Sequence, residues 1–207
     1  MKKRSGPKFT QELVPGKLAV LSADDRIEFT QYQNETCIHE MEGVRFSECT
    51  FSSVTFADAY ACEYLDAVFD HCDFSNCDLS ESSFRRTVFS HCRLTGASLI
   101  KCSMQDVLFD SCAMDYANFS SSKWKTCGLK DCRINDAALS MCSFADTQIK
   151  NCSFASSEFI NTPLKGLDFS DSDISGIMVT RENIAGVTVS RTQAVELAGL
   201  LGIIIKE

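Results

Sequence analysis

Large apolar residues recur at every fifth position along most of this 207-residue chain. The series runs without a break from Tyr64 to Val179 and ends more weakly at Ile184 and Val189. A five-residue step turns about 140° on an α-helix and scatters these residues around all sides. On a flat strand an odd step sends each large residue to the opposite face from the last. The period therefore predicts a chain that turns a corner in every quintet, so that all large residues face one axis.

A small residue stands two positions before most of the large ones. Eleven of the 12 cysteines take this small position, and 13 of the 15 phenylalanines take the large position. Among the cysteines, only Cys37 lies outside the pattern. The other positions are rich in Ser, Asp, Asn, Lys and Arg. We therefore expect a stack of coils with both apolar positions inward, in which each coil satisfies the backbone groups of its neighbours.

One interruption shifts the frame near the start of the repeats. Phe46, Phe51 and Phe56 keep the five-residue spacing, but Tyr64 follows Phe56 only after eight residues. We interpret the shift as three extra residues within Ala57–Glu63, which make this coil irregular.

The quintets resemble the A(D/N)LXX motif of the pentapeptide-repeat family. The clearest runs are Cys72-Asp-Phe-Ser-Asn, Cys77-Asp-Leu-Ser-Glu, Ala117-Asn-Phe-Ser-Ser and Ser172-Asp-Ile-Ser-Gly. The resemblance implies an all-β fold, a right-handed quadrilateral β-helix with four quintets per coil. A coil of twenty residues agrees with the spacing of the cysteines at positions 72, 92, 112, 132 and 152, which would stack as a ladder.

The ends of the chain lack the strong repeat, which divides it into three segments. We expect a non-repeat N-terminal segment at 1–43, the β-helix at 44–190 and a C-terminal helix with an apolar tail at 191–207. The alternation in Arg26–Gln33 predicts a strand that caps the first coil. The N-terminal basic residues predict a mobile, solvated tail: Lys2, Lys3, Arg4 and Lys8.

The C-terminal segment carries the signals of a short helix. Ser190 and Gln193 have the spacing of a capping box, and they predict a helix over Thr192–Leu201 that stops at Gly202. The next three residues are all isoleucine. Three adjacent isoleucines cannot all face one small core, so we expect a partner to cover some of them.

The cysteines could be disulfides, zinc ligands or small core residues. Pairs such as Cys72 and Cys77 lack the usual spacing of zinc ligands, and stacked cysteines with parallel side chains reach a disulfide only under strain. We therefore expect twelve free thiols with no metal and no cofactor. Reduced thiols suit the cytoplasm, and no apolar run or signal-peptide core indicates a membrane or an exported protein.

Little in the sequence indicates catalysis. His71 and His91 stand twenty residues apart and would stack on the outside, but neither has an obvious nucleophile beside it. No GxSxG, HExxH, P-loop or GxGxxG motif occurs, and a rod with an apolar axis offers no cleft. We therefore expect no enzyme and no catalytic residue. The net charge of −8 also disfavours direct binding to nucleic acid.

Acidic residues dominate one stretch that contains neither Lys nor Arg. We predict that its carboxylates face outward and bind a basic partner: Asp58, Glu63, Asp66, Asp70, Asp73, Asp78 and Glu81. A second acidic cluster consists of Asp168, Asp171 and Asp173. Two readings stay open, an ordinary solvated face of a solenoid or a partial imitation of the charge on a DNA duplex.

Within the family, the chain resembles the topoisomerase-protecting branch of Qnr-like quinolone-resistance proteins and toxin-immunity relatives. The length, the near-unbroken coil and the terminal helix with its apolar tail carry this resemblance. It implies a rod that binds DNA gyrase or topoisomerase IV where DNA would lie and protects the enzyme from quinolones or toxins. Many Qnr proteins have two projecting loops, whereas this chain has at most the irregular coil that holds Asp58 and Glu63.

The resemblance also implies a homodimer formed through the C-terminus. The candidate interface residues are Leu197, Leu200, Leu201, Ile203, Ile204 and Ile205. Apolar area left open at the end of a rod favours association, and two-fold closure covers both copies at once. The alternative function is a structural or protein-interaction solenoid with no role at topoisomerases.

Overall fold

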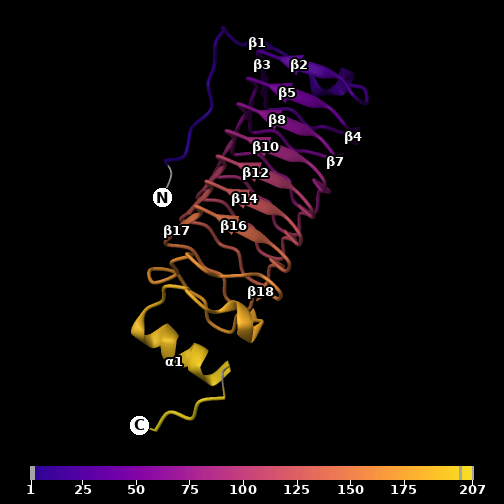
Figure 1. Ribbon diagram of the computed structural model, residues 1–207. Coiled ribbons are helices and arrows are strands. Elements are labelled where there is room, and N and C mark those ends of the chain that lie inside the picture. The colour runs from indigo at the N-terminus through magenta and orange to yellow at the C-terminus, as the bar shows by residue number, and fades with distance from the viewer. Residues whose placement is uncertain (1–2, 201, 207) are drawn as a thin grey trace.

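The computed structural model describes residues 3–200 and 202–206, which form a β-solenoid with one C-terminal helix (Figure 1). Strands of successive coils pair in parallel, and two faces of the solenoid carry an eight-stranded and a seven-stranded sheet. Isolated parallel bridges, such as Asp73 with Arg93 and Asp78 with Ser98, join the coils on the other two faces. The fold predicted from the quintets is confirmed.

The strands are short, because each coil turns again within a few residues. The eight-stranded sheet contains β1 (Val14–Pro15), β3 (Thr30–Gln33), β6 (Thr50–Ser52), β9 (Val68–Asp70), β11 (Val88–Ser90), β13 (Leu108–Asp110), β15 (Gly128–Lys130) and β17 (Gln148–Lys150). The seven-stranded sheet contains β2 (Arg26–Glu28), β5 (Arg45–Ser47), β8 (Glu63–Leu65), β10 (Ser83–Arg85), β12 (Ser103–Gln105), β14 (Lys123–Lys125) and β16 (Ser143–Ala145). Two small pairs join β4 (Met41–Glu42) to β7 (Ala59–Tyr60) and β18 (Glu158–Phe159) to β19 (Met178–Val179). The helical elements are η1 (Leu18–Val20), η2 (Arg181–Asn183) and α1 (Arg191–Leu200).

Each regular quintet turns at one residue whose backbone is left-handed. Asp66, His71, Asn76 and Glu81 have φ angles of 54°, 53°, 59° and 61°, and each stands two positions after a large residue. This conformation disfavours a residue with a Cβ by about 1–2 kcal/mol. The N–H of each of these residues donates to a carbonyl of the next coil, as from Asp66 to Arg85 at 3.0 Å. Stacking of the coils therefore offsets the cost of the corners.

The large residues stack in ladders along the axis of the solenoid. Tyr32, Phe51, Phe69, Phe89 and Phe109 form one ladder, with ring centroids 4.7–5.0 Å apart and interplanar angles of 10–14°. Each such stack adds about 0.5–1.5 kcal/mol to the free energy gained from burial. Because these rings are at most 2% exposed, the core is a continuous column with no central channel along this ladder.

The twelve cysteines are all free and buried. Loss of hydration on burial raises the pKa of Cys49, Cys62 and Cys127 to about 11 and the pKa of Cys77 and Cys102 to about 12. These thiols therefore stay neutral near pH 7, as expected of small apolar core residues.

The coil that contains Ala57–Glu63 is shortened, so the interpretation of three extra residues is wrong. Phe46 pairs with Tyr64 and Tyr64 with Phe84, so this coil has 18 residues where the next has 20. The fourth face starts at Ala59, which is fully buried and reaches the axis three residues after Phe56. A small side chain at this position lets the chain turn early, and no loop projects there.

Coiling also extends into the segment that was expected to lie outside the repeats. β2 pairs with β5 and β3 with β6, so residues 26–43 make a coil of their own, with Tyr32 and Cys37 buried in the core. Upstream, β1 pairs with β3. The strand expected over 26–33 is present as β2 and β3, which lie on adjacent faces and are separated by the corner residue Phe29 (φ 51°).

Helix α1 closes the C-terminal end of the solenoid. Ser190 and Gln193 form the expected capping box, with distances of 2.7 Å from Ser190 N to Gln193 Oε1 and 3.3 Å from Gln193 N to Ser190 Oγ. The side-chain amide of Gln193 also donates to the carbonyls of Phe169 and Ser172, which ties the helix to the coil beneath it. Among the described residues, no helix has the length and apolar character needed to cross a bilayer.

We predict that Phe89→Ala lowers the free energy of unfolding by about 3–5 kcal/mol, because it opens a cavity in the aromatic ladder. Tyr116→Ala serves as the control, since Tyr116 is 65% exposed. Denaturant titration of both variants gives the measurement. Equal stability losses in the two variants would contradict a continuous packed core.

We also predict that the free energy of unfolding falls as pH rises from about 9 to 11. The thiols of Cys49, Cys62, Cys77, Cys102 and Cys127 keep their protons in the folded state, whereas the unfolded chain releases them near the ordinary cysteine pKa, so the unfolded state gains stability in this window. Denaturant titrations at pH 8 and pH 10.5 measure the loss. A variant with Cys49, Cys62 and Cys127 changed to Ala should lose less stability over this range than the unchanged chain.

Candidate functional site

The coil repeat places residues twenty positions apart side by side, and this decides the charge pattern of the surface. From Tyr64 onward each side chain lies next to its counterpart in the following coil. A stretch that lacks Lys and Arg in sequence therefore borders the basic residues of the neighbouring coil. The net charge that a partner meets at each acidic residue from Asp58 to Glu81 therefore depends on the residues beside it in the neighbouring coils.

Asp66 is buried, so the prediction that it faces solvent is wrong. Its carboxylate accepts two hydrogen bonds from Arg86, one coil later, at 2.6 Å from Nε and 2.5 Å from Nη2. The side chains of Asp66 and Arg86 are 6% and 19% exposed. The hydrogen bond to Asp66 raises the pKa of Arg86. This pair stabilises the solenoid and offers no free charge to a partner.

Three further acidic residues form more exposed ion pairs with neighbouring coils. Glu63 lies 3.3 Å from Arg45, Asp73 lies 3.5 Å from Arg93, and Glu81 lies 3.0 Å from Lys101. The hydrogen bond from Lys101 lowers the pKa of Glu81. Ion pairs of this kind contribute little to stability, but they neutralise much of the predicted acidic surface.

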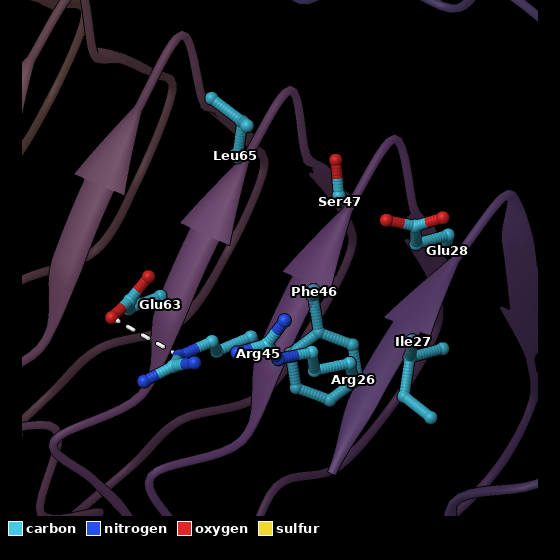
Figure 2. Close-up of a pocket in the computed structure, with 8 residues that line it drawn as sticks. All are labelled: Arg26, Ile27, Glu28, Arg45, Phe46, Ser47, Glu63 and Leu65. Carbon is cyan, nitrogen blue, oxygen red and sulfur yellow. Dashed lines mark ion pairs between the residues drawn. The ribbon is translucent and has the colours of Figure 1, made fainter. Parts of the chain in front are cut away.

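Figure 2 shows the first of these pairs on the outer surface of β2, β5 and β8. A shallow pocket there is lined by Arg26, Ile27, Glu28, Arg45, Phe46, Ser47, Glu63 and Leu65. Two guanidinium groups and two carboxylates line this pocket, so it carries charge of both signs. Its described lining does not pair a nucleophile with a general base, as nucleophilic catalysis would require.

The remaining acidic residues of the stretch are engaged differently. The carboxylate of Asp58 accepts the N–H of Asp78 at 2.7 Å, and the carboxylate of Asp78 accepts the N–H of Ser80 at 2.9 Å. Asp70 lies beside His71, with 3.0 Å between Oδ1 and Nδ1. The structure thus places all seven predicted residues on or near the surface of adjacent coils. Each of them is engaged in a hydrogen bond or an ion pair with another residue of the protein.

The second cluster keeps its charge exposed. Asp168, Asp171 and Asp173 are all exposed, and among the described residues none of the three has an ion pair. Hydrogen bonds from Ser170 and Ser175 lower the pKa of Asp168 and Asp173. Asp168 and Asp173 are therefore ionised over the whole physiological range. The cluster of Asp168, Asp171 and Asp173 forms an anionic surface that is open to a partner, next to the carbonyls to which Gln193 donates.

The N-terminal basic segment lies along the solenoid as an extended strap, which we define as residues 3–13 (Figure 1). Its backbone N–H groups donate to carboxylates at equivalent corners of different coils. Ser5 donates to Asp106 at 3.2 Å, Lys8 donates to Asp66 at 2.9 Å, and Thr10 donates to Glu48. Arg4 lies against Gly128, where an added Cβ would sit 3.9 Å from Arg4 Nε. The expected free tail is thus held in place, and Lys2 lies outside the described residues.

The C-terminal end presents an apolar surface without a cover. Of the residues predicted for dimerisation, Leu197 is buried against the last coil at 7% exposure. Four others are exposed: Leu200, Ile203, Ile204 and Ile205. Leu201 lies outside the described residues. Exposed Met178 and Val195 add apolar area to the same end of the chain.

One arrangement superficially resembles a catalytic triad, at Asp70, Ser90 and His91. Ser90 Oγ lies 2.9 Å and Asp70 Oδ1 lies 3.9 Å from the same atom, Nδ1 of His91. A triad needs the hydroxyl and the carboxylate on opposite ring nitrogens, so that one accepts a proton while the other is held. This geometry does not support nucleophilic catalysis.

Comparison with known proteins agrees with the architecture. Residues 62–139 match the family model of the pentapeptide repeat region. A trypsin-treated variant of QnrB1, a plasmid-mediated fluoroquinolone resistance protein, is 22% identical, with 94% of this chain and 97% of that chain covered and a TM-score of 0.54. Full-length QnrB1 is also 22% identical, with 91% and 95% covered and a TM-score of 0.50. A search of curated protein sequences finds no match. The similarity to QnrB1 shows a shared fold, which is generally non-catalytic.

We predict that Asp66→Ala lowers the free energy of unfolding by about 3–5 kcal/mol, because Arg86 is left largely buried without its partner. Glu63→Ala breaks an exposed pair and should cost less than about 1 kcal/mol. Thermal and denaturant unfolding measure both effects. Similar losses in the two variants would mean that the Asp66 pair is not a special support of the solenoid.

We predict that trypsin cleaves the strap several-fold faster after Glu48→Gln and Asp106→Asn are combined. These changes remove anionic acceptors of strap N–H groups and leave the inward-facing residues intact. Mass spectrometry follows cleavage after Lys8, and cleavage after Lys206 in the same digest is the internal control. Unchanged cleavage after Lys8 would show that these carboxylates do not hold the strap.

Proposed function

This chain is a pentapeptide repeat protein, and we propose that it binds DNA gyrase or topoisomerase IV as a dimeric rod, in the place of DNA. Binding there protects the enzyme from quinolones or from toxins directed at topoisomerases. The observation that carries the proposal is the match to QnrB1, a fluoroquinolone resistance protein, over nearly the whole of both chains. The match covers 94% of this chain, and the stacked coils of the chain define the rod.

The dimensions and rigidity of the solenoid support this role. Eight paired strands along one face, about 4.8 Å apart, span roughly 34 Å. The coils after Lys150 lengthen the rod further, and a two-fold dimer doubles its length. Ladders of buried rings and inter-coil hydrogen bonds hold the surface charges in fixed positions. A preorganised surface loses little entropy on binding, which favours a rod over a flexible acidic chain.

The electrostatic contribution comes from the exposed cluster, Asp168, Asp171 and Asp173. Gln193 of α1 contacts the backbone beside these residues, so closure of a dimer at the helix brings two copies of the cluster to the centre of the rod. Their carboxylates would meet Lys and Arg side chains that otherwise contact phosphates. The acidic stretch from Asp58 to Glu81 contributes less to electrostatic attraction of a partner. Ion pairs within the protein already engage four of its residues: Glu63, Asp66, Asp73 and Glu81.

We predict that Leu200→Asp combined with Ile204→Asp converts a dimer to a monomer, because each charge would be buried at the interface without a partner. Ile38→Asp is the control, since Ile38 is 71% exposed at the other end of the solenoid. Light scattering at micromolar concentration measures the mass. An unchanged chain that is already monomeric would contradict closure through the C-terminus.

We predict that immobilised gyrase binds the dimer, and that binding weakens as salt is raised. Changing Asp168, Asp171 and Asp173 to Lys should slow association by about tenfold or more. The matched control changes the paired residues Glu63, Asp73 and Glu81 to Lys, and association should fall less. A supercoiling assay with ciprofloxacin then tests protection. No binding at low salt would leave a structural or protein-interaction solenoid as the function.

A further inference from the structure

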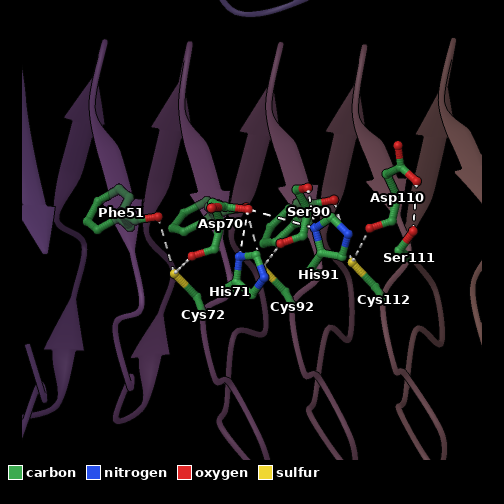
Figure 3. Close-up of polar contacts among 12 residues, drawn as sticks. Phe51, Asp70, His71, Cys72, Ser90, His91, Cys92, Asp110, Ser111 and Cys112 are labelled. Carbon is green, nitrogen blue, oxygen red and sulfur yellow. Dashed lines mark hydrogen bonds and ion pairs between the residues drawn. The ribbon is translucent and has the colours of Figure 1, made fainter. Parts of the chain in front are cut away.

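Two histidines stack on the outer surface, where the coils are most regular. His71 follows β9 and His91 follows β11, and their rings have centroids 4.8 Å apart and an interplanar angle of 14° (Figure 3). The column ends after these two rings, because Ser111 occupies the equivalent position of the next coil. Both histidines are exposed, so solutes can reach the pair from solvent.

A carboxylate completes a set of three potential metal ligands. Oδ1 of Asp70 lies 3.0 Å from Nδ1 of His71 and 3.9 Å from Nδ1 of His91. One ligand atom from each of the three residues can be chosen so that all lie within 4.8 Å of one another. Figure 3 shows both rings with a nitrogen toward Asp70. Two coils after Asp70, the carboxylate of Asp110 is not available in the same way, since it lies 3.2 Å from Lys130.

The backbone under these side chains is fixed before any ion arrives. His71 and His91 are left-handed corner residues, both with φ of 53°. The N–H of His71 donates to the carbonyl of Ser90 at 2.9 Å, and the N–H of His91 donates to that of Asp110 at 3.0 Å. The next residues, Cys72 and Cys92, are buried in the core. Only side-chain rotation therefore remains to be lost on binding.

We propose that Asp70, His71 and His91 form a surface site for a divalent transition-metal ion such as Zn²⁺, Co²⁺ or Ni²⁺. Imidazole nitrogen with one carboxylate suits these ions, whereas Ca²⁺ and Mg²⁺ prefer oxygen ligands alone. Metal–nitrogen bonds of about 2.0–2.1 Å require the two rings to turn from face-to-face toward edge-on. Both rings are exposed, so the turn displaces solvent and breaks the hydrogen bond between Ser90 and His91 without disturbing the core.

Three protein ligands leave the remaining coordination positions of the ion open. Water fills these positions in the isolated protein, and a donor atom from another molecule can replace it. The site differs from the acidic surface proposed above, because it depends on the histidine pair. Its existence can be tested without any topoisomerase.

The test is a titration of the full chain with Co²⁺. Calorimetry measures the binding, and the visible spectrum reports the ligands of the bound ion. We expect one equivalent to bind, and His71→Gln or His91→Gln to weaken binding at least tenfold. The chain has only three histidines, so His39→Gln is the matched control and should bind like the unchanged chain. Unfolding curves of all variants verify that the solenoid is intact.

Three outcomes would overturn the site. The first is no binding at Co²⁺ concentrations up to about a hundred micromolar. The second is binding that survives both His71→Gln and His91→Gln. The third is a strong near-ultraviolet thiolate-to-cobalt band, which would assign the ion to one of the cysteines instead. Asp70→Asn separates the carboxylate from the pair and should weaken binding less than loss of either ring.

Discussion

The hydrogen bonds between successive coils are the interaction on which the rest of the structure depends. They satisfy the backbone of every coil, and they offset the strain of a left-handed residue in each regular quintet. They also align equivalent side chains at the strand spacing of about 4.8 Å. Aromatic ladders, buried cysteines, ion pairs and the histidine stack all follow from this one alignment.

Much of the fold could be predicted because packing leaves a direct trace in the sequence. A five-residue period allows only a chain that turns in every quintet, and Phe and Cys mark the inward positions from Phe46 onward. The first coil was missed because Ile27, Tyr32 and Cys37 are too varied in size to show the period. The early turn at Ala59 was misread for a related reason. Spacing alone cannot distinguish three added residues from two lost ones, and the small buried side chain is what decides.

The candidate site is harder to predict, because acidic residues that are close in sequence lie beside basic residues of the neighbouring coil. Adding twenty to Asp66, Asp73 and Glu81 gives Arg86, Arg93 and Lys101, so the ion pairs could have been found from the coil length. The exposed state of Asp168 and Asp173 follows from the same operation, since no basic residue stands twenty positions before or after either of them. Arg191 stands twenty positions after Asp171, but it begins helix α1 and does not continue the coils. The strap could not be predicted, because carboxylates bind its backbone N–H groups, which every residue type except proline offers.

The constant coil length from Tyr64 onward also limits how a chain of this kind can change its length. Removing or duplicating twenty residues would shift the later coils along the axis by one strand spacing. Every later residue would stay on the same face of the solenoid. Gain or loss of one quintet would instead turn all later residues by a quarter of a coil relative to the earlier ones. Such a change between Asp66 and Arg86 would break their ion pair, and one between the two histidines would separate their rings. Insertions and deletions that preserve the surface should therefore come in whole coils. The length of the rod can then vary in steps of one strand spacing, while its surface pattern is inherited unchanged.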